Sequence, residues 1–107
     1  MDTTITITPD VTTLINTLTV EPERQGELLA LLRENTDHCV SKLDGWISTS
    51  LIAAKDHRRV VIYSQWRDLA SIEAMRANIE MQTYFPRIAA LASFDSFAGD
   101  VVHARHA

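Results

Sequence analysis

The chain has 107 residues, enough for a single domain, and 46% of them are hydrophobic while 22% are charged. These values are typical of a globular domain and exclude a disordered chain. The net charge of −4 argues against a nucleic-acid-binding protein, because neutralising phosphates requires a basic surface.

Residues 1–10 are rich in threonine, and we expect them to form an N-terminal arm or an extra edge strand. The first clear strand is predicted from Val11 to Val20, with Leu14, Asn16 and Leu18 on one face. A buried amide without partners costs about 1–3 kcal/mol. Asn16 is therefore either satisfied by backbone groups near a strand edge or a polar group inside a pocket.

The first helix is predicted to begin at Pro22, whose missing N–H costs nothing in the first turn, and to end at Gly45. Leu28, Leu32 and Cys39 fall on one apolar stripe of this helix. Cys39 is the only cysteine, so the chain has no intramolecular disulfide. On a buried stripe this side chain is expected to be a small core residue rather than a nucleophile.

Two strands follow, Trp46 to Ala54 and Arg59 to Trp66, and the turn between them is too short for anything but an antiparallel hairpin. Alternation places four side chains of the second strand on one face: Val60, Ile62, Ser64 and Trp66. Trp66 stands where a buried strand gives way to a helix, and it is our first candidate for a pocket wall.

The second long helix is predicted from Asp68 to about Glu80, and it carries Ile72 and Met75 on its apolar stripe. A break follows, after which Pro86 starts a short third helix through about Ala92. The last strand is predicted at about Phe97 to His103.

The resulting order, β-α-β-β-α-β, predicts a ferredoxin-like α+β domain over residues 11–104, with helices on one face of an antiparallel sheet and a short tail at 105–107. The other face of the sheet is predicted to carry Ile15, Ile47, Leu51, Val61 and Tyr63. This surface is too apolar to leave in water, so we expect a homodimer in which a partner sheet covers it.

No apolar run reaches the length of a membrane span, and the first residues lack the pattern of a signal peptide, so the cytoplasm is the expected location. A catalytic Ser-His-Asp order, a phosphate-binding glycine loop and a pair of catalytic carboxylates are also missing from the sequence.

Three segments together resemble the antibiotic biosynthesis monooxygenase family: residues 19–22 (TVEP), 43–46 (LDGW) and 60–66 (VVIYSQW). The resemblance extends over about Val11 to Ala104 and implies a dimeric α+β barrel of this topology. Characterised members include cofactor-free oxygenases that convert anthrone-type aromatic polyketides to quinones. Other members are quinol monooxygenases or haem-degrading oxygenases.

Carried over residue by residue, the resemblance implies three catalytic residues. Trp66 matches the family's pocket tryptophan, Asn16 matches a first-strand asparagine, and Arg87 falls close to a pocket arginine. The substrate pocket is expected to include Leu14, Leu18, Ile62, Ser64, Ile72 and Met75. Ile62 replaces an asparagine of the polyketide oxygenases, while Leu51 and Ile72 replace tyrosines of one of them, so a more apolar pocket is expected here.

The resemblance implies oxidation of a hydrophobic aromatic substrate, such as an anthrone, a quinol or a polyketide, by O₂ without cofactor or metal. A non-catalytic ligand-binding or pathway accessory dimer with the same pocket is the alternative. Haem degradation would require a histidine on the second helix, and Leu69 to Glu80 contains none.

Overall fold

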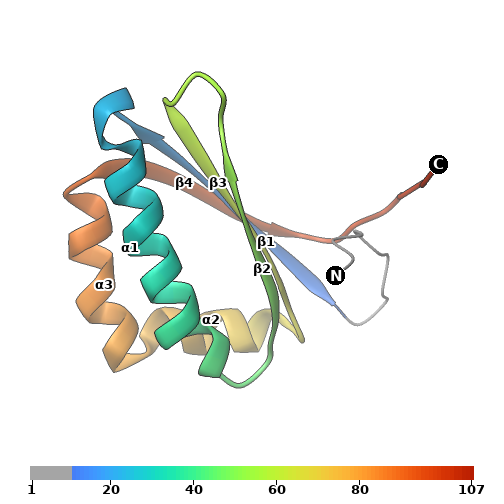
Figure 1. The fold of residues 1–107 in the computed structure, drawn as a ribbon. Helices are drawn as coiled ribbons and strands as arrows, with labels where there is room; N and C mark the ends of the chain where they lie inside the picture. The colour runs from blue at the N-terminus through green and yellow to red at the C-terminus, as the bar shows by residue number, and fades with distance from the viewer. Residues whose placement is uncertain (1–10) are drawn as a thin grey trace.

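The computed structural model describes residues 11–107 and contains a four-stranded antiparallel sheet with its helices on one face (Figure 1). The strands, in spatial order β2-β3-β1-β4, are β1 (Thr12–Val20), β2 (Trp46–Ala53), β3 (Arg59–Trp66) and β4 (Ala92–Gly99). The α-helices are α1 (Gln25–His38), α2 (Leu69–Ala77) and α3 (Ile79–Ala89), and two short 3-10 helices flank α1, η1 (Pro22–Arg24) and η2 (Val40–Lys42). The predicted ferredoxin-like α+β fold is confirmed, and the predicted arm, residues 1–10, lies outside the described residues.

Strand β1 lies between β3 and β4 and determines which side chains face the helices. Asn16 pairs with Ile62 of β3 and with Ser96 of β4. Because side chains alternate along a strand, Leu14, Asn16 and Leu18 share the face that the helices cover, as predicted. Leu14 and Leu18 are only 2% and 1% exposed.

A bulge at the start of β2 changes which of its side chains face the helices. The register of β2 against β3 shifts between Trp46 and Ser48, after which Leu51 lies opposite Ile62. One extra residue moves every later side chain of a strand to the other face. The prediction that Leu51 lies on the open face is therefore wrong: it packs against the core, and Ile52 is exposed instead.

The break between the last two helices falls at Asn78, earlier than predicted. The Asn78 side-chain oxygen accepts a 3.0 Å hydrogen bond from the backbone N–H of Met81 and so caps α3. Pro86 does not start a helix but lies inside α3. The helix continues past it because Met81, Tyr84 and Ile88 form a buried stripe, which offsets the backbone hydrogen bond that proline cannot donate.

The predicted ends of two other elements are also corrected. Helix α1 ends at His38 instead of Gly45, and Gly45, with φ of 86°, turns the chain into β2 where a Cβ would overlap the Ser71 side chain. Strand β4 begins at Ala92 because Ala92 pairs with the last residue of β1, Val20, so the strand ends before most of the predicted Phe97–His103 segment.

The core lies between the sheet and the helices, and its largest fully buried side chains are Trp66, Leu18, Leu28, Leu32, Ile72, Val60 and Cys39. Burial raises the pKa of the Cys39 thiol, which agrees with the core position predicted for it. Within residues 11–107, none of the helices combines the length and the apolarity that crossing a membrane requires.

Candidate active site

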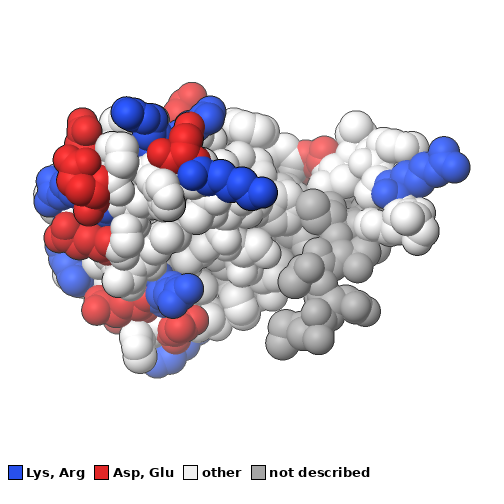
Figure 2. Space-filling model, turned by 45° about the horizontal axis from the view of Figure 1, so that its top comes forward, with Lys and Arg blue, Asp and Glu red and all other residues white. Residues whose placement is uncertain are grey.

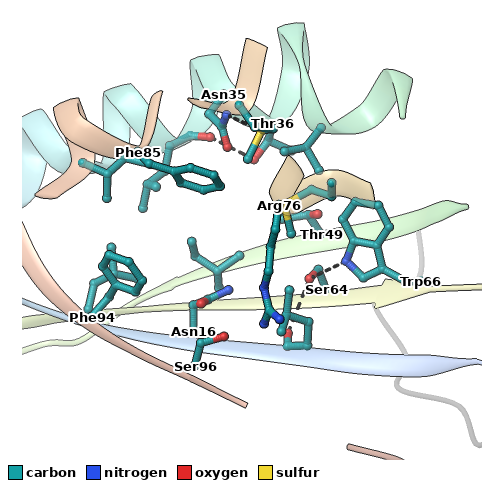
Figure 3. A pocket seen from close by; sticks show the side chains of 18 residues that line it. Asn16, Asn35, Thr36, Thr49, Ser64, Trp66, Arg76, Phe85, Phe94 and Ser96 are labelled. Carbon is teal, nitrogen blue, oxygen red and sulfur yellow. Dashed lines mark hydrogen bonds between the residues drawn. The ribbon is translucent and has the colours of Figure 1, made fainter. Parts of the chain in front are cut away.

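A cavity of about 540 Å³ lies between the sheet and the helices (Figure 3). All four strands contribute to its floor, α1 and α3 form its roof, and two residues of α2, Met75 and Arg76, also line it. Most of the lining side chains are apolar, including Leu14, Leu18 and Ile62 on the floor and Phe85 and Ile88 on the roof. A volume of this size is within the range of pockets that enclose small organic ligands.

The polar side chains that line the cavity are Asn16, Asn35, Thr36, Thr49, Ser64, Arg76 and Ser96. Within residues 11–107, no Asp, Glu or His side chain lines it, and no three such residues or cysteines are grouped as a metal site would require. The cavity therefore presents neutral hydrogen-bonding groups and one cation, and it offers no carboxylate or imidazole base.

Asn16 lies on the cavity floor, where Figure 3 shows its amide directed toward the open space. Its neighbours across the strands are Ile62 and Ser96, and none of the hydrogen bonds found among residues 11–107 uses its side chain. Of the two interpretations that the sequence leaves open, the position of Asn16 corresponds to a polar group inside a pocket. Its amide is free to donate to a ligand.

Trp66 forms one end of the cavity and is 1% exposed. Its indole N–H donates a 3.1 Å hydrogen bond to Ser64 Oγ, which in turn lies 3.4 Å from the backbone oxygen of Leu14 as a weak donor. Because the indole N–H already has a partner, Trp66 offers the cavity only its apolar ring. The polar group at this end of the cavity is the hydroxyl of Ser64.

The predicted residues divide into those that line the cavity and those that do not. The structure brings seven of the nine together around it: Asn16, Trp66, Leu14, Leu18, Ile62, Ser64 and Met75. Ile72 is fully buried in the core and does not reach the cavity, because α2 turns this side chain into the packed layer.

Arg87 lies outside the cavity, and its predicted place there is corrected. The buried stripe of α3 leaves Arg87 on the outer side, where Nη1 is 3.3 Å from Glu34 Oε2 and the guanidinium lies 5.3 Å from the centre of the Tyr84 ring. The hydroxyl of Tyr84 and the guanidinium of Arg87 together hold the pKa of the Glu34 carboxyl below its usual value.

The cation at the cavity is Arg76 of α2, which extends from the helical layer toward the sheet (Figure 3). Its Nη1 is 3.1 Å from Glu73 Oε1, and both side chains are partly in solvent. Three of the lining residues are exposed, Arg76, Phe94 and Ser96, so the cavity reaches solvent beside them.

Sequence reasoning missed Arg76 and Asn35. Asn35 stands on the buried stripe of α1, three residues after Leu32 and four before Cys39, and this polar interruption is the same signal that drew attention to Asn16. Arg76 gave no such signal, because an arginine beside Met75 on a helix is ordinary surface composition.

Comparison with known proteins gives consistent results for sequence and structure. The family model described as antibiotic biosynthesis monooxygenase matches residues 12–87. The tetracenomycin-F1 monooxygenase of Streptomyces glaucescens is 37% identical over 82 residues, which span 77% of this chain and 73% of that protein.

Two solved structures of oxygenases have the same fold. A monooxygenase from the gene ActVA-Orf6 of Streptomyces coelicolor, in complex with nanaomycin D, has a TM-score of 0.83 at 19% identity, covering 94% of this chain and 96% of that chain. SnoaB, a cofactor-independent oxygenase from Streptomyces nogalater, has a TM-score of 0.71 at 19% identity, with coverages of 92% and 96%.

Proposed function

Because the chain belongs to the antibiotic biosynthesis monooxygenase family, we propose that it oxidises a hydrophobic aromatic substrate with O₂ and without a cofactor. Family membership confirms the predicted resemblance and the assignment to the monooxygenases. The substrate class is our proposal: an anthrone, a quinol or a related polyketide. The observation that carries it is the apolar cavity of about 540 Å³ with the unpaired amide of Asn16 on its floor.

The cavity matches a planar aromatic molecule of several rings. Its apolar walls remove such a molecule from water at a gain of about 25 cal/mol per Å² of apolar surface. Three aromatic side chains line the cavity, Trp66 at one end, Phe85 in the roof and the exposed Phe94 on β4, and they offer ring faces and edges for stacking (Figure 3). Binding there fixes the orientation of the reacting carbon relative to Asn16.

The reaction that this site supports begins with loss of a proton from a CH₂ group that is activated by a ring carbonyl. The resulting carbanion passes one electron to O₂, and the two radicals combine through a new C–O bond to give a hydroperoxide. The O–O bond then breaks with loss of the second C–H proton, so that CH₂ + O₂ gives C=O + H₂O. The aromatic substrate supplies the electrons, and the step needs no other reductant.

The chain's own residues act on the negative charge that develops on the ring oxygen. Asn16 donates an amide N–H to that oxygen. The Ser64 hydroxyl, which accepts from the indole of Trp66, can donate from the neighbouring strand only by turning its one proton away from its weak 3.4 Å bond to the Leu14 oxygen. Donors that are preorganised in a dry cavity stabilise such a charge more than water does. The guanidinium of Arg76 at the opening takes the place in the pocket that the resemblance implied for Arg87, and its positive charge favours the ionised form of the substrate.

Proton removal does not use a side-chain base inside the cavity, since no Asp, Glu or His from residues 11–107 lines it. The proton passes to water at the opening beside Phe94 and Ser96, the exposed part of the lining. This arrangement suits only substrates whose C–H or O–H group is already acidic, such as anthrones and hydroquinones.

A non-catalytic ligand-binding or pathway accessory protein is the second candidate. The observation that favours it is the apolar floor at Ile62, directly beside Asn16, which provides no further donor for a developing charge. Oxygen uptake separates the two functions, because a binding protein takes up the aromatic molecule without consuming O₂.

The experiment is an oxygen-electrode assay of the chelator-treated protein with a panel of anthrone and hydroquinones. Catalysis predicts O₂ uptake above the spontaneous rate, with quinone formed in equal amount, and Asn16→Leu should remove most of it. Thr19→Ala is the matched control, because Thr19 is exposed near the end of the same strand. Uptake that never exceeds the protein-free rate for any panel member would refute the proposed function.

We also propose that the chain forms a homodimer through the open face of its sheet. Ile52 and Phe97 are 53% and 63% exposed on this face, and Ile15 lies opposite Phe97 in the register. Figure 2 shows charged side chains gathered toward the helical side of the molecule, which leaves the sheet as the more apolar surface. Light scattering should give the mass of a dimer for the native chain and of a monomer for Phe97→Glu.

A further inference from the structure

Asn35 places a second amide in the cavity, on the side opposite Asn16. It belongs to α1, lines the roof and is 6% exposed, whereas Asn16 lies on the floor (Figure 3). Leu28 and Leu32 precede Asn35 on the same buried stripe. An amide among these neighbours has no packing advantage over a leucine, which is nearly the same size.

The contacts that Asn35 makes do not satisfy its hydrogen-bonding groups. Its Nδ2 donates to the sulfur of Met81 at 3.3 Å, and a thioether is only a weak acceptor. None of the hydrogen bonds found among residues 11–107 uses its Oδ1. The adjacent Thr36 differs, because its hydroxyl already donates to the backbone oxygen of Leu32 at 2.8 Å.

We propose that Asn35 binds a second oxygen of the substrate, on the edge of the ring system opposite the oxygen that Asn16 contacts. This inference rests on the proposed function, because it takes the cavity as the substrate site. Methionine side chains adapt easily to new packing and a thioether is a weak acceptor, so the amide exchanges the sulfur of Met81 for a ligand oxygen at little cost. The substrate is therefore a multi-ring aromatic with oxygen functions on two opposite edges.

The chemistry of the Asn35 amide limits which kind of substrate oxygen it can bind. A neutral amide both donates and accepts, so it recognises a ring carbonyl or a phenol equally well. The roof provides no cation to pair with a carboxylate, because the only charged residue among the described lining residues is the partly exposed Arg76 on α2. The second oxygen is thus a ketone or a hydroxyl.

The test compares two ligands that differ by this oxygen. Anthrone has one carbonyl oxygen. Anthraquinone, the product of its oxidation, has a second one on the opposite edge, where anthrone carries its reacting CH₂ group, so it serves as a non-reacting probe of an oxygen at that edge. Calorimetry without O₂ should show that Asn35→Leu weakens anthraquinone binding about tenfold and changes anthrone binding by less than about twofold. The same substitution should preserve or raise the thermal midpoint, because it extends an apolar stripe.

Met81→Leu is the matched control, because it removes the sulfur partner and keeps the amide. If Asn35 binds the ligand, Met81→Leu should keep or raise the affinity for anthraquinone, because it removes the competing sulfur and leaves an apolar side chain of similar size in the lining. A structural role predicts instead that both variants lose stability and that the two ligands weaken together. Asn35→Ser, which keeps a shorter polar group, gives a second variant if Asn35→Leu does not fold.

Two outcomes would overturn the inference. One is equal affinity of Asn35→Leu and the native chain for anthraquinone, and the other is failure of the native chain to bind anthraquinone at all. Either result leaves the proposed function standing if anthrone is oxidised. Conversely, selective loss of anthraquinone binding without any O₂ uptake would support Asn35 as a ligand-binding residue and refute the monooxygenase activity.

Discussion

The indole N–H of Trp66 donates to Ser64 Oγ across 3.1 Å, and both side chains are almost completely buried at one end of the cavity. Ser64→Ala leaves the buried indole N–H without a partner, whereas Trp66→Phe removes the donor and leaves the Ser64 hydroxyl with only its weak bond to the Leu14 oxygen. Urea unfolding should show that the two losses of stability are not additive, with a coupling energy of about 0.5–3 kcal/mol in the double variant. Additive losses would mean that the hydrogen bond contributes nothing.

Asn16→Leu removes the amide donor from the cavity floor and leaves the floor apolar. Loss of one donor to a developing oxyanion should lower kcat by about 10²–10³-fold. The thermal midpoint should not fall, since none of the hydrogen bonds found among residues 11–107 depends on this amide. A steady-state assay beside a melting curve checks both expectations, and full activity of Asn16→Leu would contradict the assigned role.

Arg76 and Arg87 form a matched pair, because each ion-pairs with a glutamate but only Arg76 lines the cavity. Arg76→Ala should raise KM for an ionised substrate about tenfold, and the effect should weaken as salt is added. Arg87→Ala should leave KM unchanged. Kinetics at several salt concentrations distinguish the two variants, and the reverse order of effects would restore Arg87 to the site.

Ile72 supports the cavity from the core without lining it. Ile72→Ala should lower the free energy of unfolding by about 2–5 kcal/mol, because it leaves a void among packed side chains. Ile79→Ala is the control: Ile79 is 86% exposed, and its loss should change the free energy by less than about 0.5 kcal/mol. Similar denaturation midpoints for the two variants would contradict this account of the core.

Asp68 links stability to pH at the start of α2. The hydroxyl and the backbone N–H of Ser71 donate to its Oδ1 at 2.7 and 2.8 Å, and these bonds lower the pKa of the carboxyl. A lowered pKa in the folded state means that the contribution is present above the unfolded value of about 3.9 and is lost as pH falls through the folded pKa.

Asp68→Asn should therefore lower the thermal midpoint at pH 7, and the gap from the native chain should narrow as the pH falls below about 4. Melting curves across this range measure the gap. A gap that stays constant down to the acid end would show that the charge of Asp68 does not contribute to stability.

Side-chain alternation was sufficient to predict the faces of the two central strands. Leu14, Asn16 and Leu18 on β1, and Ile62 with Trp66 on β3, lie where this period places them. It failed for Leu51, because a bulge in the register of β2 reverses the faces and leaves no mark in the local pattern.

The ends of helices were harder to predict where two local signals compete. Proline is common in the first turn of helices, and Pro86 was therefore predicted to start one. Asn78 instead caps α3 eight residues earlier. Arg87 was expected in the pocket only from the family resemblance, and the buried stripe of α3 leaves it on the outer side. Asn35 interrupts the apolar stripe of α1 and could have been found from the sequence. Arg76 could not, because it reaches the cavity only through the packing of α2 over the sheet, which no local pattern encodes.

Product analysis under ¹⁸O₂ tests the central claim most directly, namely that the substrate is oxidised by O₂ inside this cavity without a cofactor. The chelator-treated protein should convert anthrone to a quinone containing one ¹⁸O atom, with one O₂ consumed per product, and Asn16→Leu should suppress the reaction. A quinone whose new oxygen comes from water, or a rate equal to the spontaneous one, would contradict the claim.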